Sequence, residues 1–376
     1  MVHHLYIHIP FCISKCDYCD FYSIPFGRSG ADWSWKYVDA LLKEMDLKRN
    51  IAGNLSTVYL GGGTPTLLSA EQVAAILSGV KEIFSIGSGA EITIEANPGT
   101  VSERQLAVLR ATGTNRISIG VQSLSGRELC TLGRSHTVED CFAAVSAARK
   151  AGFDNISLDL IYGIPGQDMC IWKNTMQRAL ELSPEHVSAY ELTPERNTPL
   201  HAKLTRGVYA LPDESLVIEM YYAALEKMKA HGYLHYEISN FAKQGHESVH
   251  NLNYWDRGEY LGLGAGAHSY FKGRRTSNRP DLNGYTESIN SSVMPVDEDT
   301  AVTEQDEFNE MIFLGLRKTE GLDMRLMPDK ERLLENKAVA ALQGHGLIEI
   351  EDFHLRLTVK GLVMSTEVMV RILSEA

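Results

Sequence analysis

The chain has 376 residues, a length that predicts one large domain and a smaller one. Hydrophobic residues make up 44% and charged residues 22%, so the chain can bury a core and wholesale disorder is excluded. Acidic residues outnumber basic ones by 48 to 36, and the net charge of −12 argues against a nucleic-acid partner. No apolar run approaches the roughly 18–20 residues that span a bilayer, and the N-terminus lacks a secretory signal, which predicts a cytoplasmic protein.

Six short runs rich in β-branched residues end near glycine, proline or asparagine, and they predict strands. They lie at residues 5–9, 57–60, 91–96, 116–121, 156–161 and 187–192. Helical patterns separate them at residues 35–49, 69–84, 102–111, 137–150 and 172–182, the second of which begins with the capping box Ser-x-x-Gln. This alternation predicts an α/β fold, in which a parallel sheet curls into a partial (β/α)6 barrel of the TIM type or a complete one.

The remaining chain is expected to finish this domain and to add a second one. A helix is predicted at 213–231, and the stretch 233–280, rich in glycine, asparagine, histidine and aromatic residues, is expected to complete a first domain over 1–290. Residues 290–299 are polar, contain a proline and predict a linker. Residues 300–376 predict a small winged-helix-like α+β domain, with helices at 304–316, 330–342 and 359–373 and a hairpin at 346–358.

Three of the six cysteines form the pattern Cys-x-x-x-Cys-x-x-Cys directly after the first predicted strand, at Cys12, Cys16 and Cys19. Thiolates suit iron–sulfur clusters and zinc, and a 4Fe–4S cluster normally takes four cysteines. Three cysteines therefore predict a cluster with one iron atom open to a substrate or cosubstrate. A zinc site with His8 as fourth ligand, a disulfide and unliganded cysteines are the alternatives. The other cysteines, expected to behave as small hydrophobes on helices or near helix starts, are Cys130, Cys141 and Cys170.

Glycine and polar residues mark the ends of several predicted strands, where the loops of parallel sheets carry the chemistry. A carboxyl within an apolar strand, as at Glu95 and Asp159, is costly unless it is paired or faces a site. The run Gly-Gly-Gly-Thr-Pro-Thr at 61–66 either forms a tight turn or lets the backbone approach a ligand. Arg134 either pairs with a carboxylate or shares that site. The residues singled out in this way are Gly62, Gly63, Thr64, Glu95, Gln122, Arg134 and Asp159.

The cysteine pattern, with Tyr18 before its third cysteine, resembles the radical S-adenosylmethionine (SAM) superfamily, whose fold is a partial or full βα barrel. In that superfamily the open iron binds the amine and carboxylate of SAM, and an electron from the cluster cleaves SAM to a 5′-deoxyadenosyl radical. The resemblance implies two cofactors here, a 4Fe–4S cluster on the three cysteines and SAM beside it. It places these residues in the SAM pocket: Tyr6, Tyr18, Gly62, Gly63, Thr64, Glu95, Gln122, Arg134 and Asp159.

Two further runs, Tyr-Ile-His-Ile-Pro-Phe-Cys at 6–12 and Asp-Leu-Ile-Tyr-Gly-Ile-Pro at 159–165, resemble the oxygen-independent coproporphyrinogen III dehydrogenase family, over essentially the whole chain. The dehydrogenases carry a fourth cysteine, where this chain has Phe21, and an N-terminal extension before the first strand, which is missing here. His-Asn-x-x-Tyr-Trp at 250–255 is typical of the other branch, the haem chaperones. This branch implies haem as ligand, a haem-accepting protein as partner and a cluster-dependent homodimer.

His250 is the candidate haem ligand, because imidazole is a usual axial ligand and the neighbouring aromatic faces suit a macrocycle. The alternatives are His268 as the ligand, or a His250 that only shapes a loop by hydrogen bonding. Three functions therefore remain: a haem chaperone, a coproporphyrinogen III dehydrogenase that converts propionates to vinyls in porphyrin biosynthesis, and a radical SAM enzyme with another substrate, such as tRNA. Phe21 and the motif at 250–255 favour the first.

Overall fold

A computed structural model describes residues 1–27 and 30–374 of the chain. Its centre is a nine-stranded sheet in the order β11-β1-β4-β5-β6-β7-β8-β10-β9. The strands from β11 to β8 run parallel, and β10 and β9 close the far edge in antiparallel pairing. The bounds are β1 Val2–Ile9, β4 Ala52–Gly62, β5 Ile86–Ala96, β6 Arg116–Gln122, β7 Ile156–Tyr162, β8 His186–Glu191, β9 Leu234–Glu237, β10 Asn240–Ala242 and β11 Leu261–Leu263.

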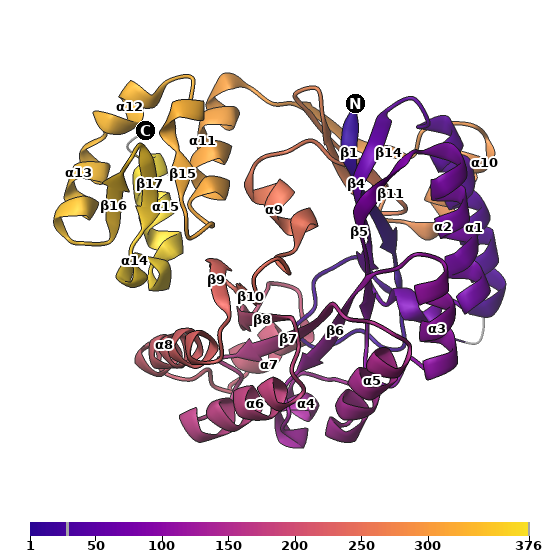
Figure 1. The fold of residues 1–376 in the computed structure, drawn as a ribbon, viewed down its shortest axis with the longest axis horizontal. Helices are drawn as coiled ribbons and strands as arrows, with labels where there is room; N and C mark the ends of the chain where they lie inside the picture. The colour runs from indigo at the N-terminus through magenta and orange to yellow at the C-terminus, as the bar shows by residue number, and fades with distance from the viewer. Residues whose placement is uncertain (28–29, 375–376) are drawn as a thin grey trace.

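Helices cover the convex face of this sheet, which curls into half a barrel (Figure 1). Every strand and helix predicted before residue 231 is confirmed, as is the partial α/β barrel. The predicted capping box is present. The backbone amide of Gln72 donates to Ser69 Oγ, and the backbone amide of Ser69 donates to Gln72 Oε1. The unpredicted α4 and α7 are too short to show a helical period. The helices are α1 Gly30–Leu47, α2 Ala70–Ile83, α3 Glu103–Ala111, α4 Gly126–Thr131, α5 Val138–Lys150, α6 Met169–Glu181, α7 Pro199–Thr205 and α8 Glu214–Ala230.

The two faces of the sheet differ in polarity because successive side chains of a strand point to opposite faces. Along β6, Ile117 and Ile119 are fully buried in the core. The alternate positions of β6 line a cavity on the concave side, and they are Arg116, Ser118, Gly120 and Gln122. This pattern also accounts for Glu95 and Asp159, which lie in apolar strands but face the same cavity.

Residues 233–301 supply β9, β10 and β11 to the main sheet and also form a second, antiparallel sheet. Its strands are β12 His268–Phe271, β13 Arg274–Asn278 and β14 Val296–Ala301, and α9 Val249–Trp255 and α10 Leu282–Asn290 accompany them. The linker predicted over 290–299 is therefore wrong in part, since β14 pairs with β13 from residue 296 onward. All residues of β14 are exposed, so no hydrophobic pattern marks this strand in the sequence.

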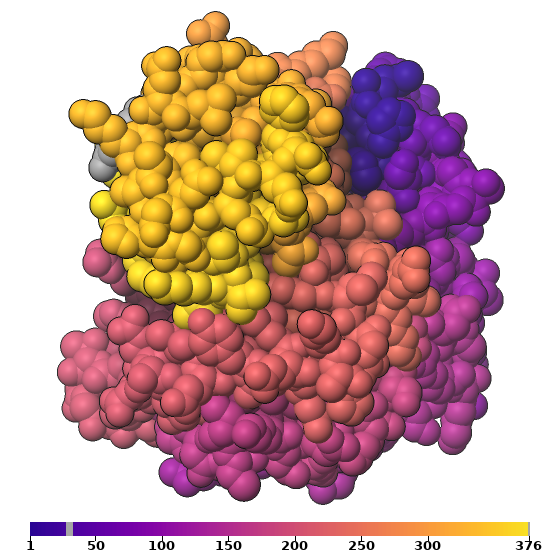
Figure 2. Space-filling model, turned by 60° about the vertical axis from the view of Figure 1, so that its left-hand side comes forward, coloured from indigo at the N-terminus to yellow at the C-terminus, as the bar shows by residue number. Residues whose placement is uncertain are grey.

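The C-terminal part confirms the predicted helices and hairpin, except that two predicted helices are each divided. Asn336 interrupts the first of these, because its side chain accepts from the amides of Ala338 and Val339 and caps a new helix. Figure 2 shows this part, in orange and yellow, resting on the chain that carries α8 and α9. The elements are α11 Glu304–Gly315, β15 Leu322–Asp323, α12 Lys330–Leu334, α13 Lys337–Gly344, β16 Ile348–Glu351, β17 His354–Leu357, α14 Val359–Val363 and α15 Ser365–Ser374.

The division into domains 1–290 and 300–376 stays a prediction. Arg257, which follows α9, forms ion pairs with Glu307 and Glu310 of α11, both at 2.8 Å, and so joins the two parts. Among the described residues, no helix has the length and apolar character needed to cross a membrane.

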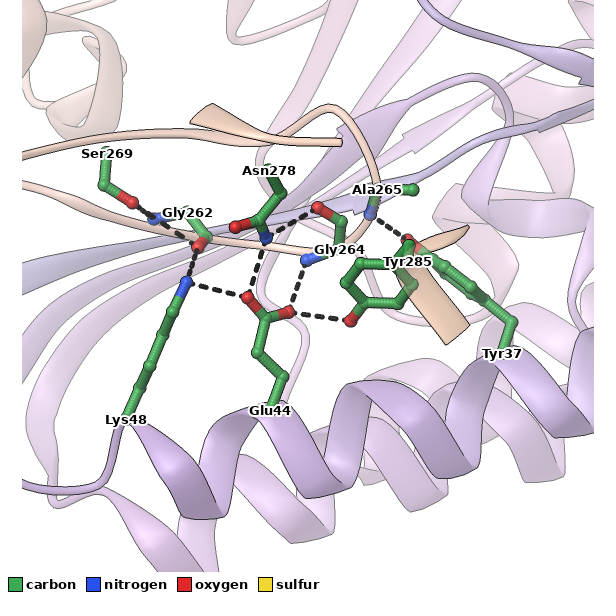
Figure 3. Close-up of polar contacts among 9 residues, drawn as sticks. All are labelled: Tyr37, Glu44, Lys48, Gly262, Gly264, Ala265, Ser269, Asn278 and Tyr285. Atoms are coloured by element: carbon green, nitrogen blue, oxygen red, sulfur yellow. Dashed lines mark hydrogen bonds and ion pairs between the residues drawn. The ribbon is translucent and has the colours of Figure 1, made fainter. Parts of the chain in front are cut away.

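A buried carboxylate joins α1 to the chain that follows β11 (Figure 3). Glu44 is fully buried, and a buried charge is stable only when it is paired and hydrogen-bonded. Its partner Lys48 also donates to the carbonyl of Gly262 at 3.1 Å. The network therefore fixes residues 262–285 against α1. Four groups donate to the Glu44 carboxylate: Lys48 Nζ at 2.7 Å, Asn278 Nδ2 at 2.7 Å, Gly264 N at 2.8 Å and Tyr285 OH at 2.7 Å.

Replacing Glu44 with alanine is expected to lower the free energy of unfolding by about 3–5 kcal/mol, because Lys48 is left as an uncompensated buried charge. Asp46→Ala is the matched control. Asp46 lies on the same helix and pairs with Arg49 at the surface, where losing an ion pair costs less than about 1 kcal/mol. Urea denaturation followed by circular dichroism measures both variants, and equal losses would contradict the proposed importance of Glu44.

Candidate functional site

The three clustered cysteines lie at the carboxyl ends of the parallel strands. Cys12 ends β2 Phe11–Cys12, which pairs with β3 Ile24–Pro25, and the loop between these strands carries Cys16 and Cys19. All three thiols line one cavity of about 420 Å³ inside the half barrel. The other three cysteines lie on helices, as predicted. Cys141 is buried like a small hydrophobe, whereas Cys130 and Cys170 are exposed.

A chain of hydrogen bonds links two of these thiols. Thr64 Oγ1 donates to Cys12 Sγ at 3.7 Å, and Arg134 Nη1 donates to Cys16 Sγ at 3.3 Å. Asn97 joins the two donors, since its Nδ2 donates to Thr64 Oγ1 at 2.7 Å and its Oδ1 accepts from Arg134 Nη2 at 2.6 Å. Donors directed at sulfur stabilise a thiolate, the form in which a cysteine binds a metal, so this chain of hydrogen bonds favours that form of both cysteines.

The donor set fits a cluster better than a single ion. The thiols are close enough to influence one another, because burial raises the pKa of Cys19 to about 11 and the nearby thiols of Cys16 and Cys12 act in the same direction. Among the described residues, however, no three metal-binding side chains converge on one point. In a 4Fe–4S cluster each cysteine binds a different iron atom, so the ligands surround a volume instead.

The alternative of a zinc site with His8 loses its fourth ligand. His8 Nδ1 lies 3.0 Å from Tyr6 OH, and Nε2 lies 2.9 Å from the carbonyl oxygen of Tyr22. Both ring nitrogens are therefore engaged within the protein. The same contact places the predicted SAM-pocket residue Tyr6 beside the cavity wall.

The glycine run after β4 is required both by packing and by the cavity. Gly62 has a φ of +110°, in the region that favours glycine, and a Cβ there would lie 2.4 Å from the His8 ring. A Cβ on Gly63 would lie 2.6 Å from the carbonyl oxygen of Phe11. Both glycines also line the cavity of the cysteines, so the tight turn brings bare backbone to the place where a ligand would lie.

Glu95 lies on the cavity wall near the end of β5. Tyr59 OH donates to its Oε1 at 2.8 Å, and the amide of Gly62 donates to its Oε2 at 3.1 Å. Burial raises the pKa of Glu95 to about 7 in spite of these donors. An adjacent cation would favour the ionised carboxylate, so this position suits an ammonium group.

The neighbouring strands complete the polar wall. Asp159 on β7 accepts from Ser118 at 3.0 Å and from Ser188 at 2.9 Å. Gln122 ends β6 with a φ of 62°, a rare conformation for a residue with a side chain, at a break in the strand register. Backbone of this kind is often found at functional sites, and it places Gln122 on the cavity wall.

Most of the predicted SAM-pocket residues therefore line one cavity together with the cysteines. Tyr6 lines an adjoining cavity instead, in the company of Gly62 and Glu95. The residues of the shared cavity are Tyr18, Gly62, Gly63, Thr64, Glu95, Gln122, Arg134 and Asp159.

Asn97 and Arg116 are among the residues of this site that sequence reasoning missed, as are Tyr59, Ser118 and Ser188. Asn97 joins the donors of the two thiols, but nothing in its position near a strand end distinguishes it. Arg116 is only 2% exposed and lines the cavity, and its Nε has no hydrogen-bond partner among the described residues. Its spacing of two from Ser118 along the strand was the signal that could have identified it.

A larger cavity of about 840 Å³ adjoins the first at the open side of the half barrel. Phe21, the residue in place of a fourth cysteine, lines both cavities and is 65% exposed. The flat faces of aromatic side chains suit a planar, apolar ligand. Those on the walls of the larger cavity include Tyr6, Tyr22, Tyr59, Tyr254, Trp255 and Tyr260.

His250 lies in the first turn of helix α9 and not in a loop, as was expected. The helix could not be predicted from the sequence, because α9 has only seven residues and two of them are asparagine. His250 is 1% exposed, with Nδ1 2.6 Å from Thr57 Oγ1 and Nε2 2.9 Å from Tyr254 OH. Its ring also stacks on Tyr59 at 5.0 Å. Neither nitrogen is free in this arrangement, which favours the hydrogen-bonding alternative. The second candidate, His268, is exposed on the same cavity.

Comparisons with known proteins agree with this geometry. Residues 6–179 match the radical SAM superfamily, and residues 302–364 match the HemN C-terminal domain. The chain is 38% identical to the heme chaperone HemW of Bacillus subtilis, over 98% of this chain and 99% of that protein. It is 34% identical to the heme chaperone HemW of Mycobacterium tuberculosis, over 97% and 93%.

This chain belongs to the HemW family of radical SAM proteins. The fold of this HemW-family chain is shared with coproporphyrinogen III oxidase (HemN) of Escherichia coli, a radical SAM enzyme. The two structures agree with a TM-score of 0.85 over 98% of this chain and 89% of that one, at 24% sequence identity. The resemblance seen in the cysteine pattern and in the motif at 250–255 is thereby confirmed at the level of the family.

Replacing Cys12, Cys16 or Cys19 singly with alanine is expected to abolish the brown 4Fe–4S absorbance of the anaerobically purified protein. The cluster would lose one of its three protein ligands. Cys130→Ala and Cys170→Ala are matched controls, because both cysteines are exposed and lie outside the loop. Iron and sulfide at wild-type amounts in a loop variant would show that the ligands are misassigned.

The buried state of His250 predicts a pH dependence of stability. Burial lowers its pKa to about 3, and His4 adds to the shift. The unfolded imidazole binds a proton near pH 6.5, but the folded one does not, so stability is full above pH 6.5 and falls toward pH 3. His250→Gln is expected to reduce the slope of the free energy of unfolding against pH. The reduction corresponds to at most one proton bound on unfolding.

Denaturant unfolding measured at several pH values tests this expectation. His345→Gln is the matched control, because the His345 side chain is exposed. Other buried histidines keep part of the slope in both variants. A His250→Gln slope equal to that of the wild type would contradict the expectation.

Proposed function

We propose that this protein is a haem chaperone, which binds haem in the larger cavity and transfers it to an acceptor protein. One observation carries the proposal: an aromatic-walled cavity of about 840 Å³ adjoins the cavity lined by the three cysteines. Haem is a flat and largely apolar plate, and its faces would lie against tyrosine and tryptophan rings. The relatives named as heme chaperones support the same assignment.

We infer that the cysteine loop holds a 4Fe–4S cluster and that SAM occupies the cavity beside it. When bound, the cluster supplies single electrons to SAM. The protein's own contribution is to direct Thr64 and Arg134 at two of the sulfur atoms. Glu95 would bind the ammonium group of SAM. Burial raises the pKa of its carboxyl group, and an adjacent cation would favour the ionised form.

The identity of the iron ligand also remains a proposal. His250 would reach the haem iron only by giving up its hydrogen bonds to Thr57 and Tyr254. His268 lies exposed on the same cavity and needs no such exchange. The acceptor protein and a cluster-dependent homodimer complete the proposal, both by resemblance to the family.

Haem retention and substrate turnover test the proposal together. The anaerobically purified protein, with its cluster confirmed by iron content, is expected to keep stoichiometric haem through gel filtration and to pass it to a haem-free acceptor. Incubation with SAM, a reductant and coproporphyrinogen III is expected to yield no decarboxylated product by mass spectrometry. Stepwise loss of carbon dioxide would instead identify a dehydrogenase, and failure to retain or donate haem would end the chaperone proposal.

A variant of the cavity wall sharpens this test. Tyr22→Ala removes one aromatic face of the larger cavity and is expected to weaken haem binding about tenfold, roughly 1.4 kcal/mol. Tyr222→Ala, on helix α8 and outside this cavity, is the matched control. Absorbance titration gives both affinities, and equal affinities would place the haem elsewhere.

A further inference from the structure

One end of the larger cavity gathers polar atoms that have no partner. Buried polar groups are hydrogen-bonded as a rule, so unpartnered ones mark a place for water or a ligand. Among the described residues, four residues on the walls of this cavity each have a buried side-chain atom without a hydrogen bond. These atoms are Glu237 Oε2, Asn240 Oδ1, Trp255 Nε1 and Arg317 Nε.

The four residues come from three parts of the fold. Glu237 ends β9 and Asn240 begins β10 at the edge of the main sheet, and they are 0% and 2% exposed. Trp255 ends α9. Arg317 follows α11, and its carbonyl oxygen accepts from the amide of Ile238 between β9 and β10. The cluster is therefore built on rigid backbone and not on a loose surface loop.

Arg317 is held in a position suited to a carboxylate. Its guanidinium stacks on the Trp255 ring, 4.4 Å from the ring centroid. Stacking leaves the donor edge of a guanidinium free, and that edge matches the two oxygens of a carboxylate. The Nε of this guanidinium has no hydrogen-bond partner within the described chain, although Arg317 lies near enough to Glu237 to act on the pKa of its carboxyl group.

The end of the larger cavity that contains Arg317 differs from the rest of the cavity in its charge. Arg317 is the single arginine or lysine among the described residues that line it. Its other ionisable wall residues are histidines, tyrosines and carboxyl groups, none of which carries the permanent positive charge of a guanidinium. The carboxyl groups are Asp20, Glu95, Glu237, Asp297 and Glu298. A ligand that carries a carboxylate on an apolar body would therefore turn that carboxylate toward Arg317.

We propose that Arg317 and Trp255 form a carboxylate subsite that binds one propionate of the tetrapyrrole and so sets the orientation of the macrocycle in the larger cavity. The proposal rests on the proposed function, because it assumes that this cavity holds a tetrapyrrole. The indole N–H and the guanidinium Nε–H are the two donors. Burial raises the pKa of Glu237, and Arg317 acts in the opposite direction, so Glu237 beside this subsite is less acidic than a free carboxyl group.

Haem and its dimethyl ester distinguish this subsite from general apolar binding. The ester keeps the macrocycle and the iron but has no carboxylate. Arg317→Met is expected to weaken haem binding about 10- to 100-fold and to leave binding of the ester unchanged. Arg325→Met is the matched control, since this arginine belongs to the same C-terminal part, is exposed and pairs with Asp323.

Trp255→Phe provides a second test that does not depend on the folding of Arg317→Met. It keeps an aromatic ring for the guanidinium but removes the indole donor, and it is expected to weaken haem binding about threefold to tenfold with no change for the ester. All titrations use full-length protein with an intact cluster and are followed by absorbance.

The outcomes separate the two proposals. Equal losses for haem and ester would assign Arg317 a structural role and overturn the subsite. Unchanged haem affinity in both variants would mean that water, and not a ligand carboxylate, bonds to the four unpartnered atoms. That result would also overturn the subsite. A wild-type protein that binds neither haem nor ester would contradict the proposed function itself. If coproporphyrinogen III alone shows the Arg317-dependent loss, the subsite stands but its ligand is a dehydrogenase substrate.

Discussion

The buried carboxylate of Glu44 is the contact on which the shape of the ligand cavities depends. A half barrel leaves one side of its sheet open, and that side must be covered by chain that returns from elsewhere. The four donors to Glu44 hold residues 262–285 against α1, at the β1 edge of the opening. Asn278 both donates to Glu44 and lines the larger cavity, so this network and the cavity wall share a residue.

The concave face of the sheet has the opposite character from the core beneath the helices. Several strands turn a polar side chain inward, and some of these groups bond to one another, as in the contacts of Asp159 with Ser118 and Ser188. The donors directed at the cysteine thiols are Thr64, just after β4, and Arg134, just after α4. A redox cofactor and a planar ligand would thus occupy adjoining spaces, separated by Phe21, Tyr59 and Glu95, which line both cavities.

The C-terminal part contributes more than a cover for the barrel. It pairs with α9 through Arg257 and reaches the edge of the main sheet through the backbone of Arg317. The Arg317 side chain also stacks on Trp255, the last residue of the helix that carries the His-Asn-x-x-Tyr-Trp motif. This helix is buttressed from two sides, by β4 through His250 and Thr57 and by α11 through the ion pairs of Arg257. A ligand in the larger cavity would therefore contact both parts of the chain.

The alternation of strands and helices, the cysteine loop and most of the polar wall can be predicted from the sequence, because each of these depends on spacing within a few residues. The cysteines are neighbours in the chain, and Glu95 and Asp159 are conspicuous within apolar strands. Tertiary structure alone decided the bridging role of Asn97, the inward position of Arg116, the helical setting of His250 and the grouping of Glu237, Asn240, Trp255 and Arg317. These features join residues that lie far apart in the chain, and only packing decides which of them meet.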